Sequence, residues 1–170
     1  MARRVVKWIG GVAVATLVGI QLVPVDRSNP PVNGPLEAPD EVMAVLRKAC
    51  FDCHSNETTW PWYSYVAPVS WLVAKDVEEG RRELNFSEWA TMSEKKRAHK
   101  LKETWEEVEE GEMPLPIYIP MHPDANLTDS QRTALIDGLR ATFGSTSTRD
   151  ANTTTTNTET SGDDGDDDGD

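Results

Sequence analysis

The sequence predicts an all-α domain built from about four helices. Four segments carry apolar residues three and four positions apart, which is the spacing of one face of an α-helix. Residues that favour helix ends flank these segments, including Thr128 at one start and Gly111 at one end. No segment alternates apolar and polar residues for long enough to predict a β-strand.

The first 25 residues are expected to form a transmembrane helix that anchors the chain in the cytoplasmic membrane. Arg3, Arg4 and Lys7 precede an uncharged run of 18 residues, 8–25, which is at the short end of what crosses a bilayer core of roughly 30 Å. A cleaved signal peptide is the alternative, but the only Ala-x-Ala, at 13–15, lies too early to suit cleavage. The positive-inside rule then places the remaining chain in the periplasm or at the cell exterior, with a single membrane pass.

Two segments without helical pattern flank the folded part, which is expected at 37–143. Residues 26–36 contain three prolines and one glycine and are interpreted as a linker. Residues 144–170 have almost no apolar side chain and are expected to form a disordered acidic tail. Eight acidic residues and no basic residue lie in 150–170, which leaves a formal charge of -4 of the total -12 for the rest. This acidic balance argues against nucleic-acid binding.

The first two helices of the domain are expected at about 40–49 and 68–80. The first begins after Pro39 and carries four apolar residues on one face, Val42, Val45, Leu46 and Ala49. The second has similar spacing, and Gly80 is expected to stop it.

The third and fourth helices are expected at 93–110 and from about 128 to 143. Gly111 ends the third. Thr128 and Gln131 have the spacing of a capping box at the start of the fourth. Four helices give a small core, so a buried prosthetic group would add to it.

A C-x-x-C-H motif, Cys50 to His54, follows the first of these helices. Two thiols at this spacing reach the two vinyl groups of a haem, and the histidine that follows lies beneath the iron. We therefore expect Cys50 and Cys53 to hold one haem c covalently and His54 to be the proximal iron ligand. A thioredoxin-like redox pair would need a βαβ context, and the sequence shows no such pattern. A zinc site would need further ligands, and no second ligand pair is evident.

Met113 is the first candidate for a sixth iron ligand. It lies in a turn-rich loop, 111–116, which Pro114 and Pro116 would stiffen. A thioether ligand raises the reduction potential, which suits an electron carrier. His122 and Met121, slightly further along, are alternatives, and an open sixth position is another.

Aromatic residues follow the motif closely. Trp60, Trp62 and Tyr63 are candidates for packing against the haem, with ordinary core packing as the alternative for each.

Over about 29–139, the sequence resembles the single-haem "haem-binding domain" proteins of bacteria. The resemblance rests on segments at 29–31, 50–58, 60–63, 67–71, 76–80, 84–89 and 111–114, with Tyr118 and His122-Pro123. It implies a cytochrome c-like helical fold with covalent haem on Cys50, Cys53 and His54. It implies no established reaction, and the acidic tail departs from the family pattern.

The expected function is that of a membrane-anchored monohaem cytochrome that passes single electrons between redox proteins outside the cytoplasm. An electron carrier is favoured over an enzyme, because His99 and His122 are the only other imidazoles and no distal acid–base pair is evident. The alternative is a haem-based enzyme or ligand sensor with an open or displaceable sixth iron position.

Overall fold

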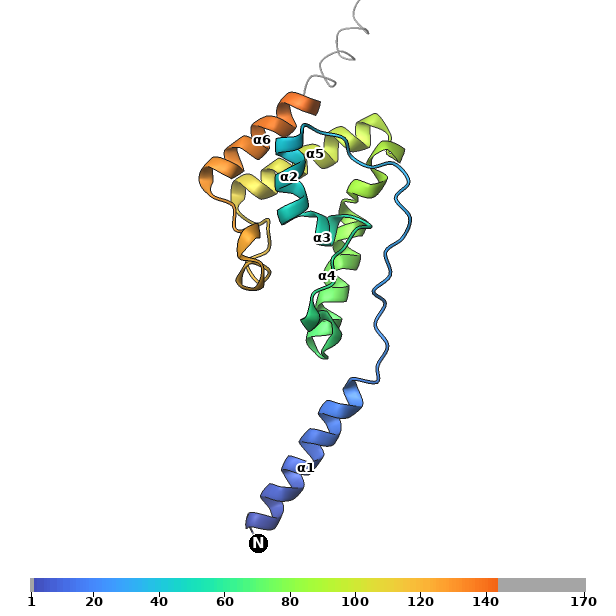
Figure 1. Cartoon of the computed structure of the whole chain (residues 1–170), viewed down its shortest axis with the longest axis vertical. Helices are drawn as coiled ribbons and strands as arrows, with labels where there is room; N and C mark the ends of the chain where they lie inside the picture. The colour runs from blue at the N-terminus through green and yellow to red at the C-terminus, as the bar shows by residue number, and fades with distance from the viewer. Residues whose placement is uncertain (1, 144–170) are drawn as a thin grey trace, which may run out of the picture.

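The computed structural model describes residues 2–143, and this part of the chain is helical, without a β-strand (Figure 1). The helices are α1 (Ala2–Ile20), α2 (Asp40–Ala49), α3 (Phe51–His54), α4 (Val69–Glu83), α5 (Glu94–Glu110) and α6 (Asp129–Phe143). Short 3-10 helices connect them: η1 (Trp62–Tyr65), η2 (Phe86–Thr91), η3 (Ile119–Met121) and η4 (Pro123–Ala125). The all-α prediction is confirmed, while the expected tail at 144–170 lies outside the described residues.

Two of the expected helix ends are found at Thr128 and Gly111, whereas the expected end at Gly80 is not. Thr128 and Gln131 form the reciprocal capping box, in which each side chain accepts from the other residue's backbone N–H, at 2.9 and 3.3 Å. Gly111 has φ +80° and ends α5 in the left-handed conformation that favours glycine. Gly80 does not stop α4, which continues to Glu83. Its lack of a side chain serves a close helix contact instead.

The core lies where α2, α5 and α6 pack together (Figure 1). Leu46 of α2 and two residues of α6, Leu135 and Leu139, are almost fully buried. Leu101 and Val108 complete this core from α5. Burial of each such side chain contributes about 1.5–3 kcal/mol, so the three helices form a stable support for the shorter α3 and for α4.

Helix α1 stands apart from this core at the N-terminal end of the chain (Figure 1). No helix among residues 2–143 has the length and apolarity needed to cross a membrane, so the expected transmembrane helix is not found. The reason is that α1 ends at Ile20 and begins among three basic residues. Only thirteen uncharged residues, 8–20, are helical, which at 1.5 Å per residue is shorter than a bilayer core.

The segment between α1 and α2 contains no helix and lies along the domain in extended form. Gln21 binds both backbone groups of Ala67, at 2.9 and 3.1 Å. Further along, Gly34 and Leu36 donate backbone hydrogen bonds to Ser87 and Phe86 of η2. Residues 26–36 were expected to be a linker, and their backbone bonds attach them to the folded part.

Candidate functional site

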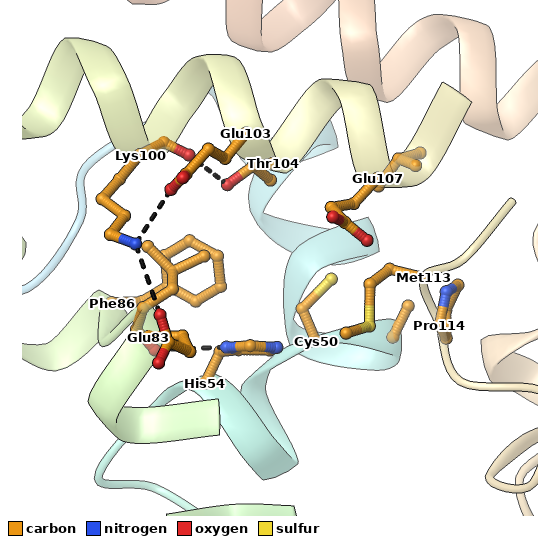
Figure 2. A pocket seen from close by; sticks show the side chains of 13 residues that line it. Cys50, His54, Glu83, Phe86, Lys100, Glu103, Thr104, Glu107, Met113 and Pro114 are labelled. Carbon is orange, nitrogen blue, oxygen red and sulfur yellow. Dashed lines mark hydrogen bonds and ion pairs between the residues drawn. The ribbon is translucent and has the colours of Figure 1, made fainter. Parts of the chain in front are cut away.

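A cavity of about 270 Å³ lies between the α2–α3 junction, the end of α4 and one face of α5 (Figure 2). Cys50, His54 and Met113 all line it, although Met113 is distant in sequence. The remaining lining residues come from α2, the α4–η2 turn, α5 and the loop after α5: Ala49, Glu83, Leu84, Phe86, Lys100, Glu103, Thr104, Glu107, Val108 and Pro114.

The one-turn helix α3 places Cys50 and His54 at the same cavity. Cys50 closes α2 by donating its N–H to Leu46, and its φ of -126° breaks the helix there. The His54 N–H then returns to the Cys50 carbonyl at 2.9 Å. Residues four apart in such a turn share one face, so the thiol and the imidazole point the same way.

The imidazole of His54 has a defined tautomer. Its Nδ1 lies 2.9 Å from the Gly80 carbonyl oxygen and 3.2 Å from that of Leu84. A carbonyl can only accept, so Nδ1 carries the proton and Nε2 keeps its lone pair. Burial lowers the pKa of His54 and keeps the ring neutral, although the two carbonyls act in the opposite direction. A neutral imidazole with one nitrogen bonded to a carbonyl is the usual form of a metal-binding histidine.

Both motif cysteines are free thiols. Burial is the main cause that raises the pKa of Cys50 to about 12 and that of Cys53 to about 11. Reactive redox cysteines have depressed pKa values, so this pair has the opposite character. Cys53 does not line the cavity and packs instead against Gly80 of α4.

Met113 reaches the cavity because of how α5 ends. After Gly111, the N–H groups of Glu112 and Met113 both return to the Glu107 carbonyl, at 3.0 and 3.2 Å. The chain therefore folds back over the end of α5, and Met113 packs against the core, followed by the buried Pro114. Figure 2 shows its thioether directed toward the space that the Cys50 thiol and the His54 ring also face.

Charged side chains of α5 and α4 form one wall of the cavity, and none of them is among the site residues expected from the sequence. Lys100 binds Glu103 at 2.8 Å and Glu83 at 3.6 Å, and the hydrogen bond to Glu103 is the main cause that raises its pKa (Figure 2). The spacing of Lys100 and Glu103 on one face of a helix was visible in the sequence. Which face of α5 would meet His54 was not.

The other candidates for a sixth ligand lie away from this cavity. His122 stacks on Tyr118, with ring centroids 3.7 Å apart, and contacts the Tyr63 hydroxyl at 3.3 Å. Tyr118 in turn donates a hydrogen bond to Asp52 at 2.8 Å. Met121 is 53% exposed in η3. Neither His122 nor Met121 lines the cavity.

The aromatic candidates are also placed outside the cavity lining. Trp62 is 71% exposed and meets Tyr63 edge to face. Trp60 has a buried indole nitrogen without a hydrogen-bond partner among the described residues. The aromatic ring that does reach the site is Phe86, which meets His54 edge to face at 6.3 Å and stacks on Phe51.

The donor set of the cavity suits a haem better than a bare metal ion. Among residues 2–143, no three His, Cys, Asp or Glu side chains come together as a metal site. A porphyrin supplies four nitrogen ligands itself, so the protein needs to add only axial ligands. One neutral imidazole and one thioether on a single cavity meet that need, and apolar Leu84, Phe86 and Val108 offer surface for the ring.

Comparison with known proteins agrees with this donor set. The family model described as "Haem-binding domain" matches residues 15–141, which include every residue of the cavity. No curated protein and no solved structure matches the chain significantly. Because the family match covers most of the 170 residues, this chain belongs to the haem-binding domain family.

Proposed function

We propose that this protein is a monohaem c-type cytochrome that transfers single electrons outside the cytoplasm. The observation that carries the proposal is the shared cavity of Cys50, His54 and Met113, with His54 Nδ1 bonded to backbone carbonyls. When bound, a haem supplies an iron that accepts and releases one electron. The chain would hold the iron through His54 Nε2 and the Met113 sulfur.

The two cysteines would hold the haem edge through thioether bonds. Cys50 supports this role by its place on the cavity, whereas the role of Cys53 rests on the C-x-x-C-H spacing and on the family. Their raised pKa values also disfavour a dithiol redox function, because the thiolate is the nucleophile in thiol–disulfide exchange.

The charged and the apolar residues that line the cavity would have different roles. Phe86 and Val108 exclude water from the side of the cavity that would hold the ring. The Glu83–Lys100–Glu103 group leaves net negative charge beside the site. A redox partner with a basic surface would be attracted to it, and the rate of association would fall with added salt.

We also propose that the protein is exported and associates with the membrane through its N-terminal segment. The basic residues before an uncharged run, and the exposed apolar side chains of α1, such as Trp8, Ile9 and Val12, support both. Fractionation of cells that produce the full chain would test this. Haem protein in the membrane fraction, released by detergent, is expected, and haem protein confined to the cytosol would contradict it.

The first experiment uses the full chain produced in a host that matures c-type cytochromes. We expect haem stain to remain on the polypeptide in a denaturing gel, together with low-spin spectra and a thioether–iron charge-transfer band. A band without haem would contradict the covalent haem. A native protein that binds CO rapidly when reduced would instead indicate the ligand-sensor or enzyme function, with an open sixth position.

A further inference from the structure

We propose that Gly80 and Arg81, consecutive residues of α4, form a clamp that positions the C-x-x-C-H turn and directs the His54 imidazole at the iron. We call this pair the 80–81 clamp. It rests on the proposed function only in that His54 is taken as an iron ligand. Neither residue lines the cavity, so both would be positioning residues.

Gly80 allows α4 to approach α3 more closely than any other residue would. A Cβ at position 80 would lie 2.6 Å from the Cys53 carbonyl oxygen and 3.1 Å from both the carbonyl carbon and the Cβ of Cys53. Two of these three atoms belong to the backbone and cannot rotate away. The glycine is therefore required by space, and a side chain here would push the two helices apart.

The same residue fixes the imidazole. The Gly80 carbonyl accepts the Nδ1 proton of His54 at 2.9 Å and also accepts the Leu84 N–H of its own helix at 2.9 Å. Leu84 offers His54 a second carbonyl at 3.2 Å. These bonds exist only while α4 lies against α3, so the close contact at Gly80 determines the direction of Nε2.

Arg81 holds the chain immediately after the histidine. Its Nε donates to the Ser55 carbonyl at 2.8 Å, and one of its terminal nitrogens donates to the Thr58 hydroxyl at 2.8 Å. The guanidinium also binds Ser28 and Asn29 of the extended N-terminal segment, at 3.0 and 2.7 Å. Together, Gly80 and Arg81 hold three consecutive residues of the turn: Cys53, His54 and Ser55.

The chain offers a matched control for the glycine. A Cβ at Gly138 of α6 would lie 2.4 Å from the Cγ2 of Val42, in the core between α2 and α6 and away from the motif. Gly138→Ala thus tests crowding of a helix contact alone. Gly80→Ala adds the loss of the His54 hydrogen bond.

The test compares the full haem-loaded chain with Gly80→Ala and Gly138→Ala by reduction potential and thermal stability. A hydrogen bond from Nδ1 to a carbonyl raises the basicity of the ligand. Its loss in Gly80→Ala should therefore raise the reduction potential and alter the ferric spectrum. Gly138→Ala should lower the melting temperature and leave the potential unchanged. Equal potentials in wild type and Gly80→Ala, or equal shifts in both variants, would overturn the clamp.

Arg81→Lys separates the two halves of the clamp. The lysine keeps the charge but cannot reach the same set of oxygens, so the turn after His54 should loosen while Nδ1 keeps its carbonyls. We expect faster hydrogen exchange of backbone amides around 55–58 and a smaller shift in potential than in Gly80→Ala. Exchange unchanged at these amides would exclude Arg81 from the clamp.

A measurement on the unmodified protein decides the matter if Gly80→Ala does not fold. In the reduced, nitrogen-15-labelled haem protein, the His54 Nδ1–H should give a resolved proton signal that exchanges slowly with water. A rapidly exchanging or absent signal would overturn the clamp. Failure of the proposed function looks different, because the wild-type protein would then lack the spectrum of a histidine-ligated haem.

Discussion

The candidate ligand side chains differ sharply in what their contacts allow. His54 is neutral and has one nitrogen committed to backbone carbonyls, while Met113 has a thioether directed to the same space. His122, by contrast, is stacked on Tyr118 and bonded to neighbours of its own. At the residue scale, the strongest expectations therefore concern Met113 and the two thiols.

Met113→Ala should lower the reduction potential, by on the order of 0.1 V, because the soft thioether stabilises ferrous iron. The reduced variant should also bind CO, since its sixth position is open. Potentiometric titration and CO difference spectra measure the two effects. Met121→Ala is the matched control, and the assignment of Met113 would be wrong if the two variants behaved alike.

The haem-free chain, produced without cytochrome maturation, should lose stability as the pH rises above about 9. Burial raises the folded-state pKa of Cys50 to about 12 and of Cys53 to about 11, from 9.0. Between these values the unfolded chain binds fewer protons than the folded one, so the free energy of unfolding falls, by at most about 1.4 kcal/mol per pH unit for each thiol. Below pH 9 this contribution is fully present.

Urea unfolding at pH 8 and pH 10 measures this effect. Cys50→Ala/Cys53→Ala is the control and should show a weaker dependence on pH in that window. An identical dependence in the control would mean that other groups, such as lysines or tyrosines, cause the loss.

At the scale of elements, α6 has the clearest local device at a helix end. Its reciprocal bonds between Thr128 and Gln131 satisfy two N–H groups that a helix start leaves unpaired. Arg132, one residue later, donates to the Val108 carbonyl near the end of α5. The start of α6 is thereby attached to the helix that forms a wall of the cavity.

Thr128→Ala should lower the free energy of unfolding by about 1 kcal/mol, because the capping oxygen is lost. Chemical denaturation of the haem protein measures the change. Thr133→Ala, at an exposed position inside α6, removes the same atoms without touching the cap and should be neutral or slightly stabilising. Equal losses in the two variants would show that the cap contributes nothing.

At the scale of the whole molecule, the cavity lies between α5 on one side and the motif with the end of α4 on the other. Helices α2, α5 and α6 supply most of the buried core, and Phe51 of α3 joins it, while α4 extends away from these helices (Figure 1). Few buried apolar residues come from α3 and α4 themselves, where Phe51 and Val77 stand out. A bound haem would fill this cavity and add contacts between α5 and the side formed by the motif and the end of α4.

Haem attachment should therefore raise the melting temperature of the protein by at least several degrees over the haem-free chain, because it adds apolar contacts that only the folded state can make. Scanning calorimetry of the matured and the haem-free full chain measures this. Amide hydrogen exchange should show the largest protection gain in α3 and α4. A gain as large in α6 as in α3 and α4 would contradict this expectation.

The sequence by itself determined the four main helices of the domain and the central motif. Helical spacing, the capping box and Gly111 are encoded within one or two turns, where neighbouring residues decide the backbone conformation. The C-x-x-C-H motif is likewise local, and the family model supports the haem expected from it. The expected transmembrane helix was not found among the described residues, because α1 ends at Ile20, and a count of uncharged residues could not show where the helix ends.

Only the tertiary structure decided which distant residues share the cavity. The sequence favoured Met113 over Met121 and His122 but could not place any of them, and the fold-back after Gly111 brings only Met113 of the three to the cavity. Trp60, Trp62 and Tyr63 follow the motif closely, yet Phe86 reaches His54 instead. The partners of His54 are backbone carbonyl groups, which every residue carries. No residue letter distinguishes the carbonyls of Gly80 and Leu84, so packing alone selects them.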